Sequence, residues 1–177
     1  MNRSRRELFA VEKALQLEKH LTEIPSSGLW RCRVLYRQGI EKVEMLPYKG
    51  KAFRHFALVE FPGEYSYKYA DRRGFERLLE EYREADDLLL CRNGMLTDTT
   101  IANIALRIGG RWWTPEAPLL PGTTRARLLA EGCIGKAPLP REALWEAEGL
   151  ALMNAMIGFR ELPARSFRLL REENALH

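Results

Sequence analysis

The chain has 177 residues, of which 46% are hydrophobic and 29% are charged, and its formal net charge is +4. This composition is enough for one large or two small globular domains. No window approaches the ~20 apolar residues that a transmembrane helix needs. No apolar segment of a signal peptide follows the N-terminal arginines, so we expect a cytoplasmic protein.

Charge and cysteine patterns argue against two classes of function. Most arginines are interspersed with glutamates, as on a solvated helix face, so we expect no nucleic-acid partner. The three cysteines are odd in number and share no CxxC spacing, which favours a reducing compartment and no metal site. A modest positive surplus suits an anionic small-molecule substrate equally well.

The first elements expected along the chain are a helix and three strands. Apolar spacing predicts a helix over residues 4–22 with Ser4 as its N-cap. The sequence Pro25-Ser26-Ser27-Gly28 breaks this helix. Alternating apolar and polar residues then predict strands at 30–34, 40–46 and 53–61.

Pro62-Gly63 reads as a boundary between a small domain, 1–61, and a larger one, 62–177. Helices are predicted in the larger part at 73–85, from Thr123 or Thr124 to 131, and at 141–149. Strands are predicted at 88–91, 104–108, 111–114 and 150–156, and Asn93-Gly94 fits a type I′ hairpin turn. Strands joined mainly by hairpin turns favour an α+β fold.

Lys68 is the first candidate for chemistry, because it lies between Tyr67 and Tyr69. A lysine packed among rings loses hydration, which disfavours its ammonium form. The neutral amine is the species that forms a Schiff base. An ordinary cation–π contact is the alternative, and for this tripeptide alone it is the more common one.

Asp98 is the second candidate, in the segment "NGMLTDTTIANIAL" at 93–106. A carboxylate among threonines could hold a proton on a cationic heteroaromatic nitrogen. It could also cap a turn, which is the commoner role of such an aspartate.

Two further segments could line a ligand site. In "LPGTTR" at 120–125, a glycine precedes Thr123 and Thr124 at a helix start, where free N–H groups and hydroxyls suit a phosphate. The alternative is an ordinary N-cap. Asn154 and Ala155 lie in the apolar run "MNAMIG", where they could line a pocket or where the Asn could be a satisfied core residue.

The order of these segments resembles the class IV, or fold-type IV, pyridoxal-phosphate enzymes, which include branched-chain and D-amino-acid aminotransferases and 4-amino-4-deoxychorismate lyase. "NGMLTDTTIANIAL" is similar to the family's acid-bearing strand-loop-strand, and "LLPGTTRARLLAEG" to its phosphate loop and helix. With Lys68 and "LMNAMIG", the resemblance spans about 68–163. It implies two small α+β domains, of which the N-terminal one is shortened.

The resemblance also implies a role for each candidate. Lys68 would form a Schiff base with pyridoxal 5′-phosphate and then move the proton on the substrate carbon. Asp98 would keep the pyridine nitrogen protonated, and Asn103 would brace the acid loop. The phosphate and substrate sides would be lined by Thr123, Thr124, Asn154 and Ala155.

Three departures from the family pattern change the expectations. Asp98 stands where the family usually has the longer Glu, so its contact with the nitrogen would be longer or water-mediated. Arg73 stands where aminotransferase members carry a Tyr, which argues against typical transamination. The family's phosphate-binding Arg of an "HxxR" motif has no counterpart after Met1, so we expect a substitute such as Arg72 or a start further upstream.

Within the family, "TTIAN" and "LMNAM" are nearer the aminodeoxychorismate lyases than the branched-chain transaminases. We therefore expect elimination of pyruvate from an amino substrate, 4-amino-4-deoxychorismate, to give 4-aminobenzoate, a step of folate biosynthesis. One alternative is an amino-acid aminotransferase of branched-chain or D-amino-acid type. A second is a degenerate, non-catalytic protein that binds the cofactor or another protein. A homodimer is implied by the resemblance alone.

Overall fold

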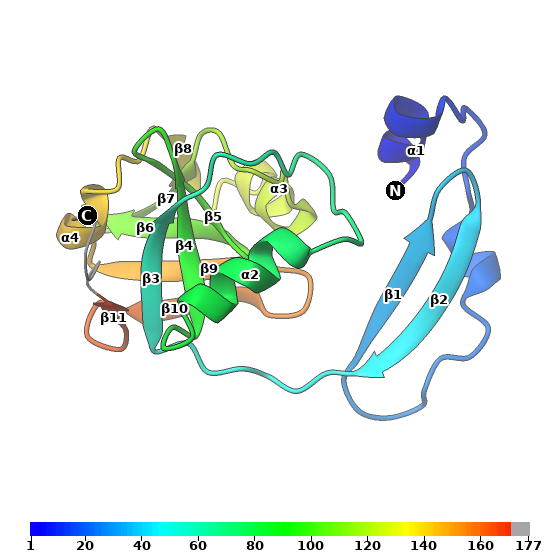
Figure 1. Cartoon of the computed structure of the whole chain (residues 1–177), viewed down its shortest axis with the longest axis horizontal. Coiled ribbons are helices and arrows are strands. Elements are labelled where there is room, and N and C mark those ends of the chain that lie inside the picture. The colour runs from blue at the N-terminus through cyan, green and yellow to red at the C-terminus, as the bar shows by residue number, and fades with distance from the viewer. Residues whose placement is uncertain (171–177) are drawn as a thin grey trace. The chain divides into compact units, whose positions relative to one another are not determined.

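The computed structural model describes residues 1–170 and divides at Lys51/Ala52 into two compact units (Figure 1). The division precedes Pro62-Gly63, because strand β3 (His55–Glu60) pairs with β4 (Asp87–Arg92) inside the second unit. No helix within residues 1–170 is long and apolar enough to cross a bilayer.

The first unit contains one short α-helix and one hairpin. Helix α1 (Asn2–Phe9) is followed by a 3₁₀ turn, η1 (Leu17–His20), and by the antiparallel strands β1 (Trp30–Tyr36) and β2 (Ile40–Pro47). The helix expected over 4–22 is therefore wrong beyond Phe9. Ala10 adopts a left-handed φ of 51°, the conformation that ends many helices.

A buried arginine holds this unit together. Arg5 donates from Nε and Nη2 to the Gln38 carbonyl, at 3.0 and 2.6 Å, and from Nη1 to the Lys13 carbonyl at 2.8 Å. Ser4 lies inside α1 rather than at its N-cap, and its Oγ is 2.7 Å from the Tyr36 hydroxyl. Ser4 and Arg5 are the buried residues of residues 1–51, so polar contacts rather than an apolar core order this unit.

As far as residue 170, the second unit is a mixed sheet with three helices. The strands follow the path β10-β9-β6-β5-β4-β3-β11, and β7 pairs with β6 and β8. The elements not yet bounded are α2 (Arg73–Glu81), β5 (Met95–Thr99), β6 (Asn103–Ile108), β7 (Arg111–Pro115), α3 (Thr123–Ala130), β8 (Gly135–Ala137), α4 (Ala143–Glu146), β9 (Gly149–Asn154), β10 (Gly158–Pro163) and β11 (Arg168–Leu170). This is the α+β class expected from the sequence. Asn93 and Gly94, with φ of 52° and 73°, form the expected turn between β4 and β5.

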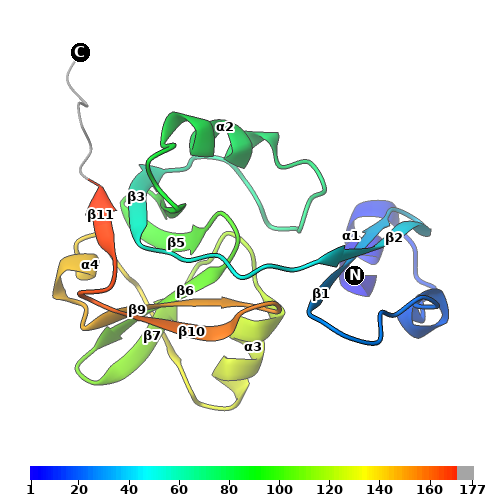
Figure 2. The same cartoon turned by 90° about the horizontal axis from the view of Figure 1, so that it is seen from below.

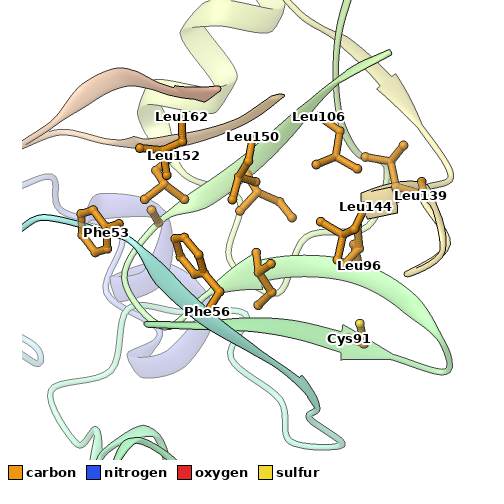
Figure 3. Close-up of a cluster of buried hydrophobic side chains, with 14 residues drawn as sticks. Phe53, Phe56, Cys91, Leu96, Leu106, Leu139, Leu144, Leu150, Leu152 and Leu162 are labelled. Atoms are coloured by element: carbon orange, nitrogen blue, oxygen red, sulfur yellow. The ribbon is translucent and has the colours of Figure 1, made fainter. Parts of the chain in front are cut away.

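The two halves of the sheet meet where β5 pairs with β6. The paired residues are Asp98 and Asn103. Figure 1 shows β3 and β4 crossing the direction of β6 and β9. The main apolar core fills the angle between the halves: Phe56 from β3 faces Leu150 and Leu152 from β9 (Figure 3). Crossed halves of this kind bury the two sheet faces that meet between them.

Helices α2 and α3 cover the outer faces of the two halves, on opposite sides of the unit (Figure 2). Phe75 of α2 belongs to a cluster with Leu88 and Leu90 of β4. Leu128 of α3 belongs to another with Ala151 of β9. The β4 residues of the α2 cluster alternate with those of the main core, because successive side chains of a strand point to opposite faces.

Candidate functional site

Asp98 is a buried carboxylate that joins the sheet to the loop before α3. It is 3% exposed; its Oδ2 accepts from the Leu120 amide at 2.8 Å and its Oδ1 from the Asn103 side-chain amide at 2.6 Å. The same Asn103 amide nitrogen donates to the Leu120 carbonyl at 2.7 Å. Asn103 therefore braces the acid, as expected, and the three residues form a closed hydrogen-bonded set.

The threonines around Asp98 form the sharp turn that places it opposite Asn103. The Thr99 hydroxyl accepts from the Ile101 and Ala102 amides at 3.2 and 3.1 Å, and the Thr99 amide donates to the Ala102 carbonyl at 2.8 Å. Such side-chain contacts stabilise a turn. We call residues 99–102 the acid turn.

Gly122 is the N-cap of α3, and its contact with Asn103 explains why a glycine stands there. A Cβ at this position would lie 2.1 Å from the Asn103 Oδ1. The helix N-terminus has no side-chain cap, with Thr123 exposed and Thr124 half-buried. Uncapped amides at a helix start are suited to bind an anion.

Arg125 is a buried residue that the sequence analysis did not single out as a site residue. Its Nε donates to the Thr114 hydroxyl at 3.1 Å and its Nη2 to the Pro115 carbonyl at 2.7 Å, which ties α3 to β7. Burial lowers the pKa of Arg125, and the charge of Asp98 acts in the opposite sense. A charged residue on the inward face of a predicted helix was the signal available in the sequence.

The pKa of Asp98 is raised to about 6, because burial disfavours the carboxylate. The Leu120 amide, the Asn103 side chain and the positive charge of Arg125 oppose this rise. Asp98 is therefore ionised at neutral pH, although less completely than an exposed aspartate. An ionised carboxylate at this place can hold a proton on a basic nitrogen that approaches it.

Asn154, at the end of β9, connects a second turn to the acid turn. Its Oδ1 accepts from the Met156 and Ile157 amides at 2.8 and 3.0 Å, and its Nδ2 donates to the Ile101 carbonyl at 3.2 Å. Ala155 is exposed in the turn that Asn154 closes. Thus the acid, the start of α3 and the turn with Asn154 and Ala155 come from distant segments and meet.

Lys68 is exposed in the loop between β3 and α2. The Tyr69 amide donates to the Tyr67 carbonyl at 2.9 Å, which makes Lys68 the central residue of a tight turn. The rings of Tyr67 and Tyr69 contact each other edge to face, 6.0 Å apart. Of the two alternatives considered for Lys68 from the sequence, burial among the rings is therefore not found, because its side chain is exposed.

Arg72 connects the Lys68 loop to the acid turn, since its Nη2 donates to the Thr100 carbonyl at 2.8 Å. This contact engages the arginine that we expected as a substitute phosphate ligand. The neighbouring Arg73 is exposed and pairs with Asp71, with Nη2 and Oδ2 2.5 Å apart. Hydrogen bonds from Arg73 lower the pKa of Asp71 to about 2.

A hollow of about 560 Å³ lies beside the Lys68 loop. Its walls are contributed by the loop and by α2, and include Tyr65, Tyr69, Arg72 and Phe75. Neither Asp98 nor the start of α3 lines it, so this hollow is distinct from the place where the acid and the helix start meet.

Comparisons with known proteins identify the family of the chain. The family model described as "Amino-transferase class IV" matches residues 66–164. An uncharacterized protein of Haemophilus influenzae is 34% identical over 142 residues, which make up 78% of this chain and 76% of that protein. The chain is also similar to a provisionally named aminodeoxychorismate lyase of Schizosaccharomyces pombe, at 32% identity over 109 residues, 54% of this chain and 46% of the relative.

One solved structure covers nearly the whole chain. It is a provisionally named 4-amino-4-deoxychorismate lyase from Haemophilus somnus, 33% identical, with a TM-score of 0.74. The match covers 88% of this chain and 87% of that one.

The contact of Gly122 with Asn103 predicts the effect of adding one methyl group. Gly122→Ala should displace the Asn103 amide and lower the free energy of unfolding by roughly 1–3 kcal/mol, measured by urea denaturation. Gly74→Ala is the matched control, because its Cβ would meet nothing within 4 Å and it lies inside α2. This control should be neutral or about 0.5–1 kcal/mol more stable. Equal stabilities of the two variants would contradict the contact.

The raised pKa of Asp98 predicts a pH dependence of stability. The carboxyl has a pKa of about 6 when folded and about 3.9 when unfolded, so the folded state binds the proton more tightly. Stability should therefore fall as the pH rises from about 4 to about 6 and then level off. Between pH 4 and 7, the wild type should lose about 1–3 kcal/mol more than Asp98→Asn. Asp87, whose pKa is also raised by burial, is present in both proteins. Parallel stability curves for the two proteins would exclude this titration.

Proposed function

Because the chain belongs to the class IV aminotransferase family, we propose that it binds pyridoxal 5′-phosphate and acts as a 4-amino-4-deoxychorismate lyase. The observation that carries the proposal is the hydrogen-bonded set of Asp98, Asn103 and Leu120. It joins a buried acid to the uncapped start of α3 across a long stretch of sequence. An acid and an anion-binding helix start, held at fixed separation, suit a ligand with a basic ring nitrogen and a phosphate.

The residues present fit this cofactor. Thr123 and Thr124 offer hydroxyls and backbone amides at the start of α3, where the helix dipole favours a phosphate. Gly122 lets this backbone approach the acid, since a side chain here would collide with Asn103. Each oxygen of Asp98 already accepts one hydrogen bond. Because a carboxylate has about four acceptor sites, at least one remains for a ring N–H.

Each residue then has a defined task. When bound, pyridoxal phosphate supplies an aldehyde that reacts with amines and a ring that withdraws electrons from the attached substrate carbon. Asp98 holds a proton on the ring nitrogen, and its pKa of about 6 keeps it ionised for this task at neutral pH. The Lys68 Nζ would take the proton from the substrate carbon and return it where the product needs it. Asn154 and Ala155 would line the side of the site next to the acid turn.

The lyase reaction is preferred over amino-group transfer on two grounds. The Schizosaccharomyces pombe and Haemophilus somnus relatives both carry the provisional lyase name. Arg73, engaged by Asp71, occupies the position where the resemblance leads us to expect a tyrosine in aminotransferases. Amino-acid transamination is the second candidate, because it is the activity after which the family is called. A cytoplasmic homodimer acting on a small amino substrate completes the proposal.

Cofactor binding predicts a covalent product at one lysine. Incubation with pyridoxal phosphate should give the protein a new absorbance band in the visible range, from the Schiff base between the cofactor and the lysine. Borohydride should then fix the cofactor on Lys68, located by peptide mass mapping. Lys68→Ala should lose both band and label, whereas Lys136→Ala, a change of an exposed lysine on β8, should keep both. A label that stays in Lys68→Ala would remove Lys68 from the proposed role.

The two candidate reactions differ in their products. With 4-amino-4-deoxychorismate, a lyase should release pyruvate and 4-aminobenzoate in equal amounts and need no keto acid. A transaminase should instead convert an amino acid only when a keto acid is added. Turnover that depends on the keto acid, with no 4-aminobenzoate formed, would reverse the order of the two candidates. Cofactor binding without either reaction would leave the non-catalytic alternative.

A further inference from the structure

Both ends of the Lys68 loop meet at the guanidinium of Arg72. Arg72 follows Lys68, and its Nη1 donates to the hydroxyl of Tyr65, which precedes Lys68, at 3.4 Å. Its Nη2 donates to the Thr100 carbonyl at 2.8 Å. The guanidinium carbon also lies 5.2 Å from the centre of the Phe75 ring at the start of α2. One side chain therefore closes the loop on itself and ties it to the acid turn.

Thr100 is in turn held from the sheet by Asp87. The Thr100 hydroxyl donates to the Asp87 Oδ1 at 2.6 Å, and the same oxygen accepts from the Leu88 amide at 2.9 Å. Both side chains are buried, with Asp87 2% and Thr100 4% exposed. Asp87 lies on β4, which pairs with strands on both sides. The contacts thus run without a break from the sheet interior to the Lys68 loop.

The contact with Thr100 requires that the carboxyl of Asp87 be buried. Its Oδ2 is buried and makes no hydrogen bond among the residues that the structure describes. A buried carboxyl with an unsatisfied oxygen is unfavourable, and burial raises its pKa. An apolar residue would avoid this cost, but it could not hold Thr100.

We propose that Asp87, Thr100 and Arg72 are positioning residues that fix the Lys68 loop against the acid turn, which directly follows Asp98. That Lys68 is the residue to be positioned rests on the proposed function. Lys68 is exposed and its loop is short, so these contacts determine where its amine can reach relative to Asp98. Small displacements of such a group cost large factors in rate.

The test compares two substitutions of one residue in the full chain without cofactor. Thr100→Val keeps the shape and loses the hydroxyl, whereas Thr100→Ser keeps the hydroxyl. Hydrogen exchange of amides at 65–72 should be about tenfold faster in Thr100→Val and near the wild-type rate in Thr100→Ser. Arg72→Met should act like Thr100→Val. Arg77→Met, which removes an exposed arginine from the helix α2 that follows Arg72, should not.

A second measurement distinguishes the positioning of the Lys68 loop from a loss of stability of the whole unit. Exchange in β6 and β9 should stay at the wild-type rate in all variants, while borohydride labelling of Lys68 by pyridoxal phosphate should slow about tenfold in Thr100→Val and Arg72→Met. Wild-type labelling rates in both variants, or unchanged exchange at 65–72, would overturn the proposal. Should Thr100→Val not fold, Arg72→Met against Arg77→Met gives the same comparison.

The two proposals fail in different ways in this experiment. If the wild type takes up no pyridoxal phosphate on Lys68, the proposed function fails. The exchange rates at 65–72 would then still decide whether Asp87, Thr100 and Arg72 hold the loop.

Discussion

The pairing of Asp98 with Asn103 is the constraint on which the second unit depends. At this pair β5 and β6 meet, and here the sheet changes direction. The same two side chains hydrogen-bond to each other and to Leu120, which fixes the loop that leads into α3. A fold contact and a chemical site thus share the same atoms, because a buried acid must be satisfied wherever it lies.

Three further contacts extend from this centre to the remaining parts of the site. Asn154 bonds to the acid turn through Ile101, and Arg72 bonds to it through Thr100. Gly122 approaches Asn103 so closely that no side chain could stand between them. The acid turn and the two residues that flank it, Asp98 and Asn103, therefore receive contacts from the Lys68 loop, from the start of α3 and from the β9–β10 turn. Such a turn can hold ligand-binding groups from separate segments in fixed positions.

The sequence predicted the elements with strong local patterns better than those that depend on distant contacts, in both units. Helix α2 and the Asn93-Gly94 turn follow from local periodicity and turn chemistry, and the structure has both. Helix α1 ends at its C-cap Ala10, which has a left-handed φ, and Arg5 bonds both to Lys13 beyond this end and to Gln38, which is distant in sequence. No local pattern could reveal those contacts.

The residues of the candidate site also differ in how far the sequence predicted them. The local patterns at Asp98 and at the start of α3 left an ordinary cap open at both places. The order of the segments, through the resemblance, singled out both and the bracing by Asn103. Asp87 could not be found in this way, because it acts through Thr100 on another element. Arg72 was expected only as a phosphate ligand, and its contact with the Thr100 carbonyl, like that of Arg125 with Thr114, depends on a partner elsewhere in the fold. The exposure of Lys68 was also not predictable, because the edge-to-face contact between the rings of Tyr67 and Tyr69 depends on the conformation of the loop. The most direct measurement is a crystal structure of the protein after incubation with pyridoxal phosphate. It should contain the phosphate at Gly122, Thr123 and Thr124, with the ring nitrogen beside Asp98 and the cofactor attached to Lys68. A cofactor bound elsewhere, with Asp98 still in contact only with Asn103 and Leu120, would contradict this account.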